Sequence, residues 1–365
     1  MKIVLVVGAR PNFMKVAPVY FALKNAENFE PILVHTGQHY DHNLSEIFFN
    51  QLGFPEPDKY LNVGSGSHAV QTAKIMVKFE QVLFDEKPDM VMVAGDINST
   101  IACALDAVKL HIPVAHLEAG LRSFDRKMPE EINRILTDSI SDILLTPSSD
   151  GDENLKKEGI SDKRIFFVGN AMIDSLKKHE QTADKSNVLE KLNLLKNNYG
   201  LITLHRPSNV DDKVNFKKIL SAFAEIQKKI PLVFPIHPRT RKQIKKFSLK
   251  PVIDEMKNFH LVEPVGYLDF LKLEKYAKLV LTDSGGIQEE TTILNVPCLT
   301  IRENTERPIT IHEGTNQLVG TDPDKIVTAA ENILSGKFKT GSSPKYWDGK
   351  TAQRIVKILE EKFNK

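Results

Sequence analysis

Acidic side chains and histidines follow several short apolar segments of this sequence, where strands would end. The candidate proton-transfer groups are Asp96, Glu118, Glu130 and His205. Asp96 and Glu118 each close an apolar segment at a glycine-containing turn, where burial can raise the pKa of a carboxyl group and suit it to general acid or base work. Each group also has a simpler role. Asp96 could cap the following helix, and Glu130 could pair with Arg134 on an exposed helix start. His205 could be no more than a structural residue that makes a hydrogen bond.

Residues 281–290 predict a phosphate-binding turn. They read as a strand, a tight turn containing Ser284, Gly285 and Gly286, and a helix. Glycines let the backbone approach an anion closely, and the free N–H groups and dipole of a helix start attract negative charge. An ordinary serine N-cap with two turn glycines would fit the same residues. Glu290 lies about two turns into the helix, where its carboxylate could bind two ribose hydroxyls.

Cationic side chains that could hold a phosphate follow other strands. Arg10 lies in the turn after the first strand, where a ligand would lie, whereas Lys15 taken alone is more typical of a solvated surface charge. A diphosphate between these two residues and the Ser284 turn would be held from both halves of the chain. Arg302 and Arg307 could add to the anion site or pair with neighbouring glutamates, and His237 also follows a strand.

The elements that must position these residues predict an α/β fold with two parallel sheets. Segments with helical spacing separate short β-branched segments, which is the signature of a parallel sheet covered on both faces. The expected strands lie at 3–7, 31–34, 90–94, 114–117, 143–145 and 165–168, then at 201–204, 232–235, 259–262, 279–281 and 298–301. Ligands bind beyond the carboxyl ends of such strands. We therefore expect two polar rims that face each other across a cleft.

The restart of the pattern indicates two domains, which a chain of 365 residues can hold. We expect an N-terminal domain over residues 1–170 and a C-terminal domain over residues 171–349. Residues 350–365 read as a charged amphipathic helix that could pack back across the first domain.

Composition excludes several classes of protein. With 49 basic and 47 acidic residues, the net charge of +2 gives no general attraction to nucleic acid or an anionic membrane. No apolar run approaches the ~20 residues of a membrane helix, and Cys103 and Cys298 suit buried thiols of a reducing compartment. We therefore expect a cytoplasmic protein.

Residues 64–69 match a dinucleotide-binding fingerprint but do not follow the first strand of a βαβ unit, so we expect no nicotinamide site.

Taken together, the motifs resemble the non-hydrolysing UDP-N-acetylglucosamine 2-epimerases. The resemblance runs from about residue 3 to residue 316, and the order and spacing of its motifs make coincidence improbable. Its motifs are GARP at 8–11 with Lys15, GQH at 37–39, GD at 95–96, HLEAGLR at 116–122, PEEINR at 129–134, GN at 169–170, HR at 205–206, DSGGIQEE at 283–290 and TERP at 305–308.

The resemblance implies two Rossmann-like domains in the architecture of B-type glycosyltransferases (GT-B), a C-terminal helix that returns to the first domain, and a homodimer. By position, the residues that match UDP contacts are Arg10, Lys15, His205, Ser284, Gly285, Gly286, Glu290 and Arg307. The catalytic carboxylates match Asp96, Glu118 and Glu130, and His205 is also a candidate. Further candidates are Arg134, His237 and Arg302.

The implied reaction inverts C2 of the sugar with neither a metal ion nor a redox cofactor. The C2 proton is poorly acidic because no carbonyl is adjacent to it. Elimination of UDP to 2-acetamidoglucal, followed by re-addition, avoids this barrier. Which carboxylate is the base stays open.

Alternative readings remain. They are a 2-epimerase of a UDP-2,3-diacetamido uronic acid, a hydrolysing epimerase, a UDP-sugar glycosyltransferase and a UDP-sugar sensor. The first is included because residues 123–128 resemble the same segment of relatives that act on that sugar. Residues 40–43 and 65–68 depart from many relatives in the region linked to activation by a second UDP-sugar, so the resemblance leaves that activation open.

Overall fold

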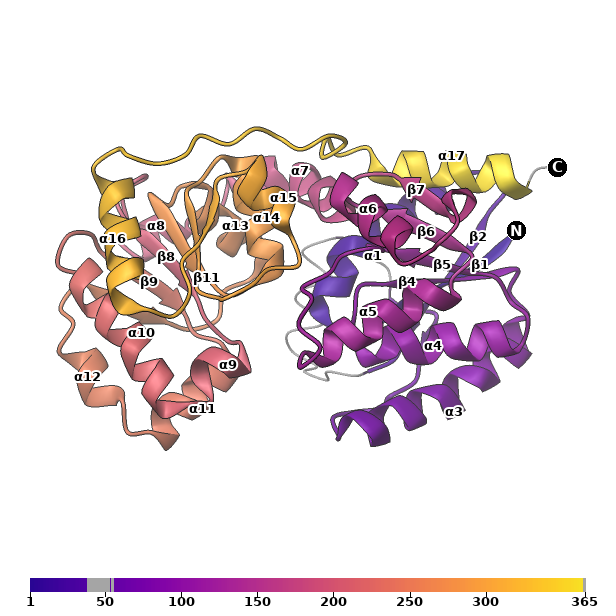
Figure 1. Ribbon diagram of the computed structural model, residues 1–365, viewed down its shortest axis with the longest axis horizontal. Helices are drawn as coiled ribbons and strands as arrows, with labels where there is room; N and C mark the ends of the chain where they lie inside the picture. Colours follow the sequence, from indigo (N-terminus) through magenta and orange to yellow (C-terminus); the bar gives the residue numbers. More distant parts are fainter. Residues whose placement is uncertain (38–52, 54–55, 364–365) are drawn as a thin grey trace. The chain divides into compact units, whose positions relative to one another are not determined.

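The structure is a computed structural model that describes residues 1–37, 53 and 56–363, and it divides into two α/β units (Figure 1). Unit 1 comprises Met1–Lys178 and Lys345–Lys365, and unit 2 comprises His179–Pro344. Each unit contains one parallel sheet. The prediction of two parallel-sheet α/β domains is confirmed.

Unit 1 is built on a sheet with the strand order β3-β2-β1-β4-β5-β6-β7. The strands are β1 (Lys2–Val7), β2 (Glu30–His35), β3 (Lys59–Tyr60), β4 (Met90–Ala94), β5 (Val114–Leu117), β6 (Ile143–Thr146) and β7 (Ile165–Phe167). The helices are α1 (Arg10–Lys24), α3 (His68–Glu86), α4 (Asn98–Lys109), α5 (Pro129–Ile140), α6 (Ser149–Lys157), the 3-10 turn Asp162–Arg164, α7 (Ala171–Ala183) and α17 (Thr351–Phe363). Helix α7 carries the chain from unit 1 into unit 2.

Unit 2 is built on a sheet with the order β10-β9-β8-β11-β12-β13. The strands are β8 (Gly200–Thr203), β9 (Leu232–Pro235), β10 (Phe259–Val262), β11 (Leu279–Thr282), β12 (Cys298–Thr300) and β13 (Asn316–Leu318). The helices are α8 (Val188–Lys191), α9 (Pro207–Val210), α10 (Lys213–Ile226), α11 (Pro238–Lys246), α12 (Lys250–Asp254), α13 (Tyr267–Lys275), α14 (Gly285–Leu294), α15 (Pro308–His312) and α16 (Pro323–Leu334).

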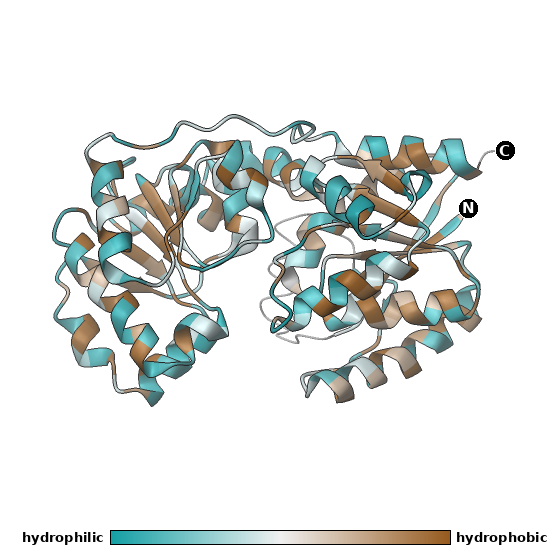
Figure 2. Ribbon diagram, in the orientation of Figure 1, coloured by the Kyte–Doolittle hydropathy of each residue, from teal (hydrophilic) through white to brown (hydrophobic). Residues whose placement is uncertain are grey.

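The hydrophobic core of each unit lies on the faces of its sheet. The central strands β1, β4, β5, β8 and β11 are almost wholly buried, and Figure 2 shows their residues as apolar. Helices cover both faces, so these strands have apolar residues at nearly every position. Among the described residues, no helix is long and apolar enough to cross a membrane.

The C-terminal segment is part of unit 1, where α17 packs against α1. The carboxylate of Asp174 accepts hydrogen bonds from the backbone N–H groups of Thr351 (3.1 Å) and Ala352 (2.8 Å) and so caps α17. The buried indole of Trp347 donates to the carbonyl oxygen of Pro147 at 2.8 Å. These bonds fix the C-terminal segment beside the ends of β6 and β7.

Candidate active site

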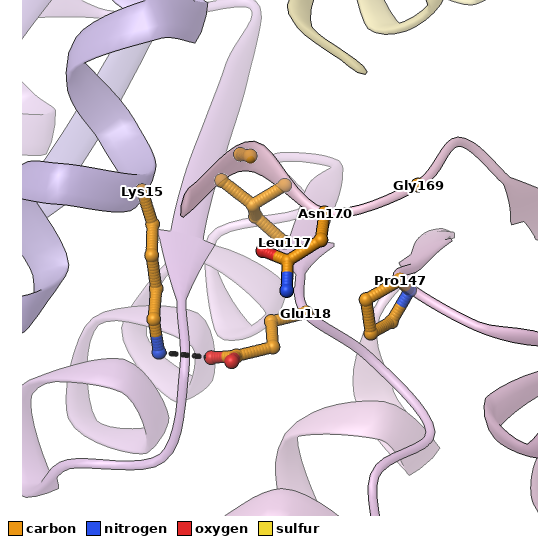
Figure 3. A pocket seen from close by; sticks show the side chains of 7 residues that line it. Lys15, Leu117, Glu118, Pro147, Gly169 and Asn170 are labelled. Atoms are coloured by element: carbon orange, nitrogen blue, oxygen red, sulfur yellow. Dashed lines mark hydrogen bonds and ion pairs between the residues drawn. The ribbon is translucent and has the colours of Figure 1, made fainter. Parts of the chain in front are cut away.

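A buried ion pair lies at the strand ends of unit 1. Lys15 extends from α1 and Glu118 follows β5, and their ammonium and carboxylate groups are bonded (Figure 3). Both residues are buried, so the expectation that Lys15 is a solvated surface charge is wrong. Gly95 leaves room for the pair, because a Cβ there would lie 3.3 Å from both charged groups. Glu118 itself has a φ of +74°, an unusual conformation for a residue other than glycine.

Asp138 holds the backbone around Glu118. It bonds to the ring of His116 at 2.6 Å, to the backbone N–H of Gly120 at 3.1 Å and to the guanidinium of Arg122 at 2.7 Å. Burial alone would raise the pKa of Asp138, but the charges and hydrogen bonds of His116 and Arg122 hold this pKa below its usual value. The 116–122 loop is therefore fixed from behind by one buried carboxylate.

Arg134 joins two carboxylates across unit 1. Its guanidinium donates to Asp96 at 2.7 and 3.1 Å and also bonds to Glu131. Glu131 in turn accepts the backbone N–H groups of Ser123 (2.9 Å) and Phe124 (2.8 Å). Arg134 therefore links Asp96, through Glu131, to the loop that follows Arg122.

The simpler role of Glu130 as an i,i+4 partner of Arg134 is wrong, because the Arg134 guanidinium bonds to Asp96 and Glu131 instead. The half-buried Glu130 carboxylate makes no hydrogen bond or ion pair with any described residue. The N-cap position of α4 is occupied by Ile97, one residue after Asp96.

A small pocket lies beside the Lys15–Glu118 pair (Figure 3). Its lining residues are Lys15, Leu117, Glu118, Pro147, Gly169, Asn170 and Ala171. The carboxylate of Glu118 is thus placed where a group bound in this pocket could exchange a proton with it.

Asp283 organises the strand ends of unit 2. This fully buried carboxylate accepts hydrogen bonds from the backbone N–H groups of His205 and Arg206 (3.0 and 2.8 Å) and from the side chain of Asn209 (3.1 Å). The loop after β8 is thereby joined to the turn after β11. The His205 ring lies 3.2 Å from Asp283 and contacts the ring of His237 at a tilt of 35°, with 5.1 Å between ring centroids.

The imidazole of His205 lies among cations. Burial lowers the pKa of His205, and the positive charges of Arg206, Arg239 and Arg302 act in the same direction, whereas Asp283 opposes them. A neutral ring can both donate and accept a hydrogen bond.

The start of α14 has the geometry expected of an anion site. Ser284 occupies the N-cap position, but within the described part of the chain its hydroxyl makes no capping bond. The simpler serine-cap interpretation therefore does not account for Ser284. Gly285 leaves room for the Arg307 guanidinium, which would lie 2.4 Å from a Cβ at this position.

Arginines and glutamates alternate around this helix start. Arg302 bonds to Glu306 at 2.8 Å, and Arg307 bonds to Glu306 at 2.5 Å and to Glu289 at 2.8 Å. Arg206 lies 3.5 Å from Glu306. Both expected arginines therefore pair with a neighbouring glutamate, and the three guanidinium groups outnumber the two carboxylates.

Glu290 lies further along α14 and is buried. The hydroxyl of Tyr267 donates to it at 3.1 Å. Glu274 is buried beside Glu290, and both burial and the Glu290 charge hold the pKa of Glu274 well above its usual range. Burial and the neighbouring charge therefore both favour the protonated form of Glu274.

The structure brings the sequence candidates together in two groups. Unit 1 holds Lys15, Asp96, Glu118, Glu130 and Arg134. Unit 2 holds His205, His237, Ser284, Gly285, Gly286, Glu290, Arg302 and Arg307. Arg10 begins α1, but its side chain lies outside the described part of the structure, as do Gln38, His39 and residues 40–43.

Sequence reasoning missed Asp138, Glu131 and Asp283 as organising residues. The signal for Asp138 was its position four residues after Arg134 on one helix, which places both on the same side of α5. Nothing local to Asp283 indicates that it bonds to a loop 78 residues earlier.

Comparisons with known proteins give one consistent result. The model of the family described as UDP-N-acetylglucosamine 2-epimerase matches residues 21–360. The UDP-N-acetylglucosamine 2-epimerase of Methanocaldococcus jannaschii is 47% identical over 98% of this chain and 99% of the relative. The UDP-2,3-diacetamido-2,3-dideoxy-D-glucuronate 2-epimerase of Pseudomonas aeruginosa is 44% identical over the same shares. A crystal structure of the M. jannaschii enzyme with UDP-GlcNAc and UDP matches with a TM-score of 0.93 at 47% identity, over 99% of this chain and 100% of that one.

Proposed function

The chain belongs to the UDP-N-acetylglucosamine 2-epimerase family, and on this premise we propose that it interconverts UDP-N-acetylglucosamine and UDP-N-acetylmannosamine without hydrolysing them. The observation that carries the proposal is the buried Lys15–Glu118 pair beside a pocket. A carboxylate beside a pocket is what proton exchange with a bound sugar would require, and the pairing with Lys15 offsets part of the cost of burying its charge.

The proposed reaction is an elimination followed by an addition. One carboxylate removes the C2 proton while the C1–O bond breaks, and the bonding electrons leave with the diphosphate. The product is 2-acetamidoglucal with a C1=C2 double bond. A proton is then delivered to the opposite face of C2, and a diphosphate oxygen bonds again to C1. Atoms and charge balance without an oxidant, a reductant or water.

The site residues divide between the two halves of this reaction. Asp96, Glu118 and Glu130 supply and remove the C2 proton. The helix start at Ser284, Gly285 and Gly286, together with the cations and His205, stabilises the charge that builds on the departing diphosphate. Cations assigned to this role are Arg10, Lys15 and Arg307. Glu290 accepts hydrogen bonds from the ribose hydroxyls.

The surroundings of these residues support their roles. The guanidinium groups of Arg206, Arg302 and Arg307 all lie at the start of α14, where a bound anion would meet them. Tyr267 and the buried Glu274 each bond to Glu290 and fix its position. The chemistry requires both groups of residues to act on the same substrate molecule, because UDP must be retained while the glycal exists.

A second candidate substrate is a UDP-2,3-diacetamido uronic acid, because a relative of 44% identity is named for that sugar. An NMR time course should offer this compound and UDP-N-acetylglucosamine in parallel, without any acceptor. We expect UDP-N-acetylmannosamine to accumulate. Free N-acetylmannosamine with UDP would indicate a hydrolysing enzyme, and turnover only with an acceptor would indicate a glycosyltransferase.

We also propose that the enzyme is a homodimer. Val70, Val77 and Phe84 are 48%, 74% and 52% exposed, and their seven-residue spacing places them along one side of α3. We call this set the α3 stripe. An exposed apolar row of this kind is typical of a surface that another chain covers.

The proposed location is the cytoplasm. Cys103 and Cys298 are buried free thiols, as the sequence predicted, and such thiols are typical of a reducing compartment.

A further inference from the structure

Asn170 presents a hydrogen-bond donor to the pocket beside Glu118. The residue lies between β7 and α7 and is only 3% exposed. Its amide oxygen accepts the backbone N–H of Met172 at 2.9 Å. Because a backbone N–H can only donate, the oxygen must face Met172 and the amide nitrogen must face away from it. Figure 3 shows this nitrogen directed toward the Glu118 side chain.

The amide nitrogen of Asn170 is buried and has no hydrogen-bond partner in the described part of the chain. A buried donor without a partner destabilises a folded protein, so such a group in a native structure requires an explanation. Its position at the pocket wall offers one, because a bound ligand with an acceptor oxygen would satisfy the donor.

The wall that carries Asn170 is held in place by the C-terminal segment. Gly169 has a φ of +92°, and the carbonyl oxygen of Tyr346 lies 2.1 Å from where a Cβ at residue 169 would be. Trp347 bonds to Pro147 on the same pocket. The donor is therefore fixed before a ligand binds, which reduces the entropic cost of making the bond.

We propose that the side-chain amide of Asn170 donates a hydrogen bond to the carbonyl oxygen of the sugar's 2-acetamido group. The inference rests on the proposed function, which places Glu118 at C2. The acetamido group is attached to C2. Its carbonyl oxygen is a neutral acceptor and could be the partner that the Asn170 amide lacks. The charged diphosphate oxygens are assigned to the start of α14 and to the cations Arg10, Lys15 and Arg307, not to this neutral amide. Asn170 would thus determine specificity for 2-acetamido sugars.

The test compares two variants with three ligands. Asn170→Asp keeps an oxygen for the Met172 N–H but removes the donor, whereas Asn170→Ala removes both. Titration calorimetry should measure the affinity of each variant for UDP, UDP-glucose and UDP-N-acetylglucosamine, the last compound being the only one with an acetamido group. The melting temperature of Asn170→Asp should stay close to that of the wild type.

We expect both variants to bind UDP-N-acetylglucosamine at least 10-fold more weakly than the wild type, with UDP and UDP-glucose affected less than 2-fold. Equal losses of affinity for all three ligands would overturn the inference. An Asn170→Asp variant that still prefers UDP-N-acetylglucosamine to UDP-glucose as strongly as the wild type would also overturn it. Either result would indicate that Asn170 has a structural role. Failure of the proposed function is a separate result, because the wild type would then neither bind nor epimerise UDP-N-acetylglucosamine. The diacetamido uronate shares the 2-acetamido group and should show the same loss if it is the substrate.

Discussion

At the residue scale, Asp96 and Glu118 each have a cationic partner from another part of unit 1. Asp96 is bonded by Arg134, and Glu118 is bonded by Lys15. These partners position the two carboxylates. The Lys15–Glu118 pair is almost wholly buried. A buried ion pair of this kind is weak evidence for stability, since desolvation offsets much of the attraction. Its position beside a pocket favours a role in chemistry.

We expect Glu118→Gln to lower turnover of UDP-N-acetylglucosamine by about 100-fold or more, the range typical of a general acid or base. UDP affinity should change by less than about 3-fold, because Glu118 is assigned to the C2 proton and the UDP contacts are assigned to other side chains. Steady-state kinetics and UDP titration check both results. The matched control is Glu158→Gln, which also removes a carboxylate bonded to an arginine, Arg122, and should leave turnover almost unchanged. Equal losses of turnover and UDP affinity in Glu118→Gln would make Glu118 a structural residue.

The start of α14 gives a second prediction at this scale. Gly285→Ala should weaken UDP binding by about 10-fold or more, about 1.4 kcal/mol, because the new Cβ would displace the Arg307 guanidinium. Titration calorimetry with UDP measures the loss. Gly66→Ala is the control, since its Cβ would meet only ordinary contacts at 3.5 Å or more. Unchanged UDP affinity in Gly285→Ala would argue against an anion site at this helix start.

At the scale of elements, the strands could be predicted well because both faces of each sheet are covered. Such strands are continuous apolar runs, and the expected runs at 90–94 and 232–235 coincide with β4 and β9. The edge strands β3 and β13 were missed, because two or three residues form no recognisable pattern.

The contacts of the site were harder to predict than the strands. Helical spacing pairs Arg134 with Glu130, but the strand end that approaches α5 brings Asp96, and the loop bonded to Glu131 completes the arrangement. The burial of Lys15 likewise depends on Glu118, 103 residues away. Sequence spacing on one element does not contain this information.

The end of β2 supplies a prediction about pH. His35 is buried between the rings of Phe13 and Tyr60, with centroids 5.3 and 5.6 Å away, and burial lowers the pKa of His35 to about 4 from 6.5. Between these values the unfolded chain binds a proton that the folded chain does not. The contribution of this group to stability therefore falls as pH decreases from 6.5 toward 4, by at most about 1.4 kcal/mol per pH unit.

The measurement is urea unfolding of the wild type and His35→Gln at pH 7.5 and pH 5. Asp106 changes stability with pH in the opposite direction, because burial raises the pKa of Asp106 to about 7. Both proteins contain Asp106, so the test is the difference in stability between them and not the wild-type profile alone. We expect the wild type to lose up to about 2 kcal/mol more than His35→Gln between the two pH values. As a control, His260→Gln replaces an exposed histidine, so this variant and the wild type should lose the same stability between the two pH values. Parallel profiles for wild type and His35→Gln would contradict this account.

At the scale of the whole molecule, the proposed homodimer can be tested through the α3 stripe. Val77→Asp places a charge on its most exposed residue and should yield monomers, because burial of an unpaired carboxylate opposes association. Light scattering should give twice the 41.1 kDa chain mass for the wild type and the single chain mass for the variant. Val214→Asp is the matched control, since Val214 is 64% exposed on α10 of unit 2. A monomeric wild type, or an unchanged mass for Val77→Asp, would exclude this surface.

The two units contribute different parts of the proposed reaction. The carboxylates proposed for proton transfer belong to unit 1, together with Arg10 and Lys15, whereas the helix start proposed to bind the diphosphate and Glu290 belong to unit 2.

The most direct test of the central claim is the fate of the hydrogen at C2. UDP-N-acetylglucosamine should be incubated with the enzyme in heavy water and followed by proton NMR. We expect every molecule of UDP-N-acetylmannosamine to carry deuterium at C2, since the proton removed by a carboxylate is replaced from solvent. An epimer that forms with its original C2 hydrogen would contradict the elimination route.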